Sequence, residues 1–170
     1  MSDSDELQVD GKPQSETVRP KAGYRSLRRE MGLALLSEIG ARSVCHHLQA
    51  RVRDPKLAEL LQRINEEGVH NVTEVQQLIR DLGGKPRRTS FRRRALARAL
   101  TWMAPIVGAR PVLRIVHNGA DTLSRWYRLY ANYLVQAGDP EHARMCERLS
   151  RRKNHHAQAL DAWIRHMPRR

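Results

Sequence analysis

Hydrophobic residues recur along this chain at intervals of three and four positions, which is the period of an amphipathic helix rather than of a strand. The apolar stripes fall in four stretches, at about 24–52, 55–82, 112–137 and 140–166. Two of these stretches open with Asp54-Pro55 and Asp139-Pro140, each of which combines an N-cap with a proline at the first helical position. The pattern predicts an all-α four-helix bundle with one longer crossover, basic and apolar, between the second and third helices.

The beginning of the chain differs from the rest in composition. Residues 1–22 are polar and acidic and cannot bury enough apolar surface to fold, so we expect a disordered acidic tail there and one helical domain over 23–168. The whole chain has a net charge of +13, and residues 1–20 contribute −3, which leaves +16 on residues 21–170. A body with that charge is expected to bind polyanions.

Several classes of protein are excluded or disfavoured by the same composition. The longest uncharged run near the middle, 99–109, has 11 residues, whereas a membrane-spanning helix needs about 20. The N-terminal residues lack the features of a signal peptide, so we expect a cytoplasmic protein, with the inner face of the membrane as a peripheral location. Cys45 and Cys146 form neither a CxxC motif nor a zinc spacing and are expected to be packed thiols.

The segment between the second and third stripes carries both arginines and large apolar residues. The residues that we expect to contact an anionic surface are Arg87, Arg88, Phe91, Arg92, Arg93, Arg94, Arg98 and Trp102. Basic and apolar faces on one helix are typical of proteins that lie on anionic lipid. Two alternatives stay open, namely a charged face that covers the end of the bundle and a cluster that binds nucleic acid. A homo-oligomer or a partner enzyme is also left open.

Polar residues stand on three of the inward stripes, where apolar residues are expected. Glu38 lies on the first stripe and Glu67 on the second, and His70 follows Glu67 by three positions. Glu-x-x-His on facing helices is the unit from which di-iron carboxylate sites are built. On the fourth stripe the helical period turns His156 inward. Two inward carboxylates need a cation, because an unpaired buried charge costs several kcal/mol.

These motifs resemble those of the demethoxyubiquinone hydroxylases, a family of the ferritin-like superfamily. Glu38-Ile39-Gly40-Ala41 is similar to the family's Glu-x-Gly-Ala, and Glu67-Gly68-Val69-His70 to its second-helix Glu-x-x-His. His155-His156 is similar to the His-His pair on its fourth helix. The resemblance covers about residues 30–160, and it implies a ferritin-like fold, a di-iron centre and oxygen-dependent hydroxylation of a membrane quinone.

The chain departs from the family at two of the metal-binding carboxylates. The third-helix glutamate falls on Ala120, and the fourth-helix glutamate falls on Arg152, with Lys153 beside it. A shift of one residue would place Lys153, also a cation, at that position. The metal ligands that the resemblance leaves are Glu38, Glu67, His70 and His155, with Asp121 as a substitute.

We therefore expect a ferritin-like protein with an incomplete di-iron site and no cofactor, in which Arg152 neutralises Glu38 and Glu67. It would act as a peripheral-membrane or accessory protein that binds a quinone or another lipid. The residues expected to line that ligand are Tyr127, Trp126 and Tyr130. Three alternatives remain: a di-iron monooxygenase of a quinone ring, a mononuclear or shifted iron site using Asp121 or His117, and a basic helical protein that binds nucleic acid.

Overall fold

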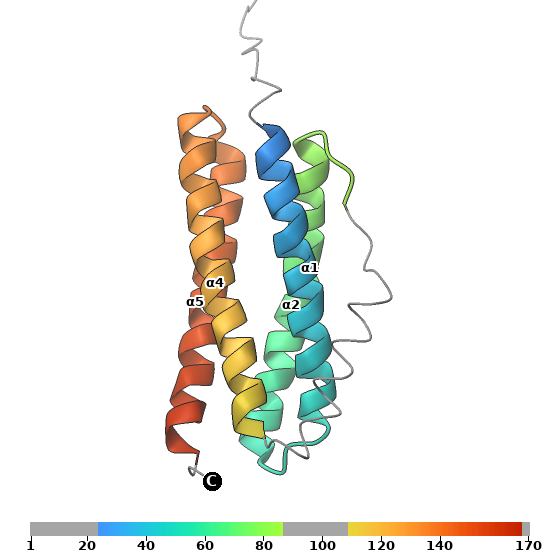
Figure 1. Cartoon of the computed structure of the whole chain (residues 1–170), viewed down its shortest axis with the longest axis vertical. Coiled ribbons are helices and arrows are strands. Elements are labelled where there is room, and N and C mark those ends of the chain that lie inside the picture. The colour runs from blue at the N-terminus through green and yellow to red at the C-terminus, as the bar shows by residue number, and fades with distance from the viewer. Residues whose placement is uncertain (1–23, 87–108, 168–170) are drawn as a thin grey trace, which may run out of the picture.

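The computed structural model describes residues 24–86 and 109–167. These residues form helices and no strand: α1 (Tyr24–Gln49), α2 (Pro55–Asp81), α4 (Ala109–Gln136) and α5 (Pro140–His166) (Figure 1). For residues 24–86 and 109–167, the prediction of an all-α bundle of four helices is confirmed. The tail expected at 1–22 and the surface-binding segment at 87–102 lie outside the described residues.

Local sequence signals set the helix ends. Asp54 accepts hydrogen bonds from two backbone N–H groups in the first turn of α2, at 2.9 and 3.2 Å. Gly83 and Gly138, which follow α2 and α4, have φ values of +78° and +73°, a conformation that residues with a side chain rarely adopt. Two boundaries differ from the prediction by three residues. The first helix, α1, ends at Gln49 rather than near Val52. The helix α4 begins early, at Ala109, and includes Pro111 in its first turn, where a proline is tolerated.

The helices pack as a ring in which α1 contacts α2 and α4, and α5 contacts α4 and α2. The pairs α1/α5 and α2/α4 therefore occupy diagonal corners. In Figure 1, α1 and α5 run downward, whereas α2 and α4 run upward. The chain consequently leaves α2 at one end of the bundle and enters α4 at the other. None of the four helices contains an apolar stretch long enough to cross a membrane.

The buried apolar residues form two clusters, one toward each end of the bundle. Leu35 and Leu149 belong to the first cluster, and Leu48 and Leu160 belong to the second. Each helix contributes to both clusters and carries polar or small residues between its two contributions. We call this middle region the polar layer and define it by Glu38, Glu67, Asn71, Glu74, Arg152, Lys153 and His156. Ala120 lies between the two apolar blocks of α4 and is also buried.

Candidate functional site at the centre of the bundle

Glu38 of α1 and Lys153 of α5 form an ion pair within the polar layer. Their exposed fractions are 1% and 3%, and Nζ of Lys153 lies 2.5 Å from Oε2 of Glu38. Because α1 and α5 occupy diagonal corners, this contact crosses the bundle. The hydroxyl of the fully buried Tyr127, on α4, donates a hydrogen bond to Oε1 of Glu38 at 3.1 Å. Both oxygens of the carboxylate therefore have a partner within the chain.

Glu67 of α2 and His156 of α5 form the second carboxylate contact of the layer. Nε2 of His156 lies 2.7 Å from Oε2 of Glu67, while the buried Nδ1 lacks a hydrogen-bond partner among the described residues. Burial lowers the pKa of His156 below its usual range, the nearby ammonium of Lys153 lowers it further, and Glu67 opposes both effects. A neutral ring whose Nε2–H donates to Glu67 satisfies this geometry, since protonation would bury an unpaired N–H at Nδ1.

Arg152 binds a different carboxylate from those expected. Its Nη2 lies 2.8 and 3.1 Å from the two carboxylate oxygens of Glu74, and its Nη1 donates to Oδ1 of Asn71 at 2.6 Å. The expected neutralisation of Glu38 and Glu67 by Arg152 is therefore wrong for both residues. Successive residues of an α-helix point about 100° apart, and it is Lys153, three residues before the inward His156, that faces the centre.

The remaining residues proposed as metal ligands do not converge on Glu38. His70 and His155 are exposed, so the periodicity that turned His156 inward is right and the family alignment that favoured His155 is wrong. Asp121 instead pairs at 2.8 Å with Arg125, one helical turn away.

The donor set in the polar layer does not fit a metal centre. Within 24–86 and 109–167, no three His, Cys, Asp or Glu side chains are arranged to hold a metal ion. An ammonium group 2.5 Å from the Glu38 carboxylate also repels any cation placed there. A di-iron centre is therefore incompatible with the side-chain arrangement that the structure describes.

The aromatic residues expected to line a ligand are packed into the core. Tyr127 and Tyr130 belong to the first apolar cluster, their rings meet edge to face at 6.2 Å, and Trp126 packs against the same cluster. Burial raises the pKa of both tyrosines. The role expected for Tyr127 is corrected, because its ring is fully enclosed and its hydroxyl is bonded to Glu38.

The two cysteines are buried, unpaired thiols, as expected, one in each apolar cluster. Burial raises the pKa of Cys45 to about 12 and that of Cys146 to about 12. The thiolate, which is the reactive form of cysteine, is therefore scarce at neutral pH.

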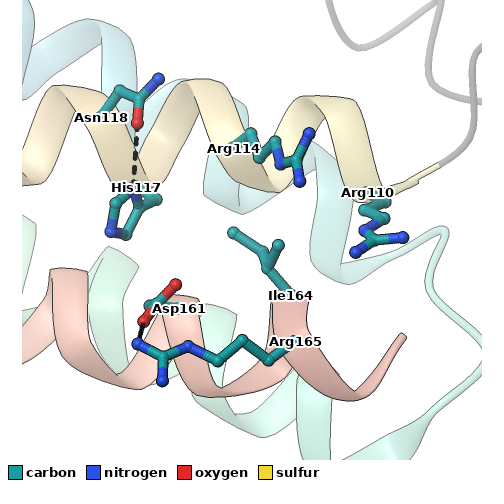
Figure 2. Close-up of a pocket in the computed structure, with 7 residues that line it drawn as sticks. All are labelled: Arg110, Arg114, His117, Asn118, Asp161, Ile164 and Arg165. Carbon is teal, nitrogen blue, oxygen red and sulfur yellow. Dashed lines mark hydrogen bonds and ion pairs between the residues drawn. The ribbon is translucent and has the colours of Figure 1, made fainter. Parts of the chain in front are cut away.

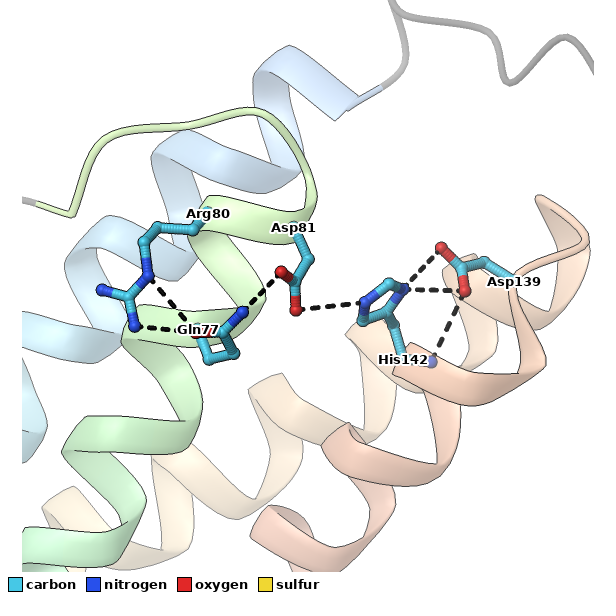
Figure 3. Close-up of polar contacts among 5 residues, drawn as sticks. All are labelled: Gln77, Arg80, Asp81, Asp139 and His142. Atoms are coloured by element: carbon cyan, nitrogen blue, oxygen red, sulfur yellow. Dashed lines mark hydrogen bonds and ion pairs between the residues drawn. The ribbon is translucent and has the colours of Figure 1, made fainter.

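A polar contact that the sequence did not reveal joins α2 to α5 near the end of the bundle. Nδ1 of the buried His142 lies 2.8 Å from each carboxylate oxygen of Asp139, and its Nε2 lies 3.5 Å from Oδ2 of Asp81 (Figure 3). The spacing of Asp139 and His142 is a local signal for the first contact. The second could not be found from the sequence, because Asp81 is distant in the chain and approaches only through helix packing.

Comparisons of the chain with models of protein families, with curated protein sequences and with solved structures find no match.

Proposed function

We propose that this chain is a metal-independent, ferritin-like binding protein that attaches to an anionic membrane surface. The observation that carries the proposal is the contact between the Lys153 ammonium and the buried Glu38 carboxylate, at 2.5 Å. Glu38 is the residue that resembles the first metal ligand of the demethoxyubiquinone hydroxylases. The parallel direction of α2 and α4 also supports the assignment, because one long crossover is characteristic of ferritin-like bundles (Figure 1).

In this proposal Lys153 replaces the metal ions as the source of positive charge. Buried carboxylates require compensation, and an ammonium group on the chain provides it without a cofactor. A lysine also leaves no open coordination position at which oxygen could bind. The polar layer then has a structural role, which is to hold the four helices in register. The protein binds its ligand without oxidising it.

The membrane part of the proposal rests on charge and on the sequence of residues 87–102. Residues 21–170 carry a net charge of +16, and each Lys or Arg close to an anionic membrane adds about 1 kcal/mol of attraction. The arginines of 87–98 stand close to apolar residues, among them Phe91, and Trp102 follows a few positions later. The resemblance indicates a quinone or another membrane lipid as the ligand class.

Iron binding tests the role of Lys153. The purified protein, incubated anaerobically with ferrous ion and then desalted, should retain well below about one iron per chain, against the two of a di-iron site. The double variant Ala120→Glu/Lys153→Glu should bind more iron than the unmodified protein, because it replaces the central cation with a carboxylate. The matched double variant Ala120→Glu/Arg152→Glu should not bind more iron, because Arg152 lies against Glu74 and away from Glu38. Two irons in the unmodified protein would overturn the proposal.

Vesicle flotation tests the membrane attachment. The full chain should float with phosphatidylcholine vesicles that contain phosphatidylglycerol and not with phosphatidylcholine alone, and added salt should weaken the binding. Changing the three arginines of 92–94 to glutamine should reduce flotation. Removing the same number of charges from exposed positions Arg128, Arg144 and Arg148 should reduce it less. Equal binding to neutral vesicles, or tighter binding to duplex DNA than to anionic vesicles, would contradict the assignment.

A further inference from the structure

A cavity lies between α4 and α5, at the end of the bundle where α4 begins and α5 ends. Its volume is about 600 Å³, which is within the range of small-molecule sites. The residues that line it are Arg110, Arg114, His117 and Asn118 from α4, and Asp161, Ile164 and Arg165 from α5 (Figure 2). None of them belongs to the polar layer or to residues 87–102, so a ligand site in this cavity is independent of the proposed function.

Helical spacing brings the basic side chains of α4 together. Arg110, Arg114 and His117 are separated by four and three residues, which places them on one face of α4. Figure 2 shows the Arg114 side chain extending along α4 toward Arg110, and the Arg110 guanidinium on the side of α4 that faces α5. Positive charge from Arg110 and Arg114 therefore lines the α4 side of the cavity.

The charges that line this cavity are not balanced. Among the described residues, Asp161 is the one acidic residue that lines the cavity, and it is already ion-paired with Arg165. The hydrogen bond and charge of Arg165 hold the pKa of the Asp161 carboxyl below its usual range. Arg110 and Arg114 have no hydrogen-bond or ion-pair partner among the described residues, and the Nε atom of Arg110 is buried without an acceptor. Two guanidinium groups thus remain available for an anion from outside the chain.

We propose that this cavity binds the phosphate group of a small phosphomonoester through Arg110 and Arg114. A guanidinium group presents two parallel N–H donors that match the oxygens of a phosphate. The dianion of a phosphomonoester balances both unpaired arginines, whereas a single carboxylate would balance one. The cavity is larger than a phosphate group and its lining is mainly polar, with Ile164 as the apolar contact. A polar, hydroxylated carrier fits this lining better than a nucleoside, because no Phe, Tyr or Trp among the described residues lines the cavity to stack on a base.

Calorimetric titration of the full chain with glycerol 3-phosphate and with inorganic phosphate tests the proposal. Arg110→Gln and Arg114→Gln should each weaken binding by at least about tenfold, the loss expected for a hydrogen-bonded ion pair. Arg128→Gln is the matched control, since it removes the same charge from the same helix about 21 Å beyond Arg114. It should change the affinity by less than about twofold. Circular dichroism and thermal unfolding establish that all the variants are folded.

The phosphate group could belong to a soluble metabolite or to a lipid, and vesicles separate the two sources. Vesicles containing phosphatidic acid present a phosphomonoester, whereas phosphatidylglycerol presents a diester. Binding of glycerol 3-phosphate that depends on Arg114 supports a soluble ligand. A preference for phosphatidic acid over phosphatidylglycerol that depends on Arg114, without binding of the soluble phosphates, supports a lipid headgroup. Binding to none of these probes, or an equal loss with Arg128→Gln, would overturn the proposal.

Discussion

Replacement of Lys153 by methionine is expected to destabilise the protein strongly. The substitution keeps a long side chain but removes the counter-charge of Glu38, whose exposed fraction is 1%. The carboxylate would retain one hydrogen bond, from Tyr127. Breaking a buried ion pair by removing one partner costs about 3–5 kcal/mol. For a domain of this size, the corresponding decrease in Tm is about 6–20 °C.

A fully apolar version of the same contact should recover the lost stability. Glu38→Met, Tyr127→Phe and Lys153→Met together remove the ion pair and the hydroxyl that would otherwise lose its acceptor. Buried ion pairs can often be replaced by apolar residues at little cost or with a gain, so we expect the triple variant to lie within about 2 kcal/mol of the original protein or above it. The contrast between the single and triple variants measures the effect of an uncompensated charge.

Urea unfolding monitored by circular dichroism at neutral pH provides the free energies of unfolding. Arg148→Met is the control, because it removes a positive charge from an exposed position on the same helix and should cost less than about 1 kcal/mol. A cost of less than about 1 kcal/mol for Lys153→Met would show that Glu38 does not need this counter-charge. An apolar triple variant as unstable as the single variant would show that the loss does not come from an uncompensated charge.

Three further predictions concern pH, thiol reactivity and capping. Because burial lowers the pKa of His156, the unfolded chain binds more protons than the folded one as the pH falls below about 6.5, so stability should decrease from about pH 8 to about pH 5.5. In urea titrations at both pH values, the loss of stability between about pH 8 and about pH 5.5 should be smaller in His156→Gln than in the original protein. The exposed control His46→Gln should lose nearly as much stability as the original protein. Cys45 and Cys146, with pKa values of about 12, should react with an aromatic disulfide at about pH 8 only after urea is added, and rapid reaction of the folded protein would contradict their burial. Asp139→Ala should lower the free energy of unfolding by about 1–2 kcal/mol, because it removes the N-cap of α5 and the carboxylate that contacts the buried His142 ring, and an unchanged urea midpoint would show that both contacts are dispensable.

Much of the fold follows from local features of the sequence. The period of the apolar residues predicted the four helices, and Asp54-Pro55 and Gly83 marked their ends, because capping and glycine conformation involve residues close together in the chain. The same period turned His156 inward. Glu38 was recognisable as a candidate site residue because a carboxylate interrupts an apolar stripe.

The sequence alone determined that carboxylates and cations would stand on the inward faces of the helices. It left open which carboxylate would pair with which cation. Arg152 and Lys153 are neighbours, and a helical stripe accepts a residue either three or four positions before His156, so periodicity could not choose between them. Because α5 packs diagonally across from α1, Lys153 forms an ion pair with Glu38, and Arg152 forms one with Glu74. The cavity beside Arg110 and Arg114 likewise exists only once α4 and α5 lie together. Contacts between distant segments depend on the rotation of each helix about its axis, which is decided by the packing of the whole bundle.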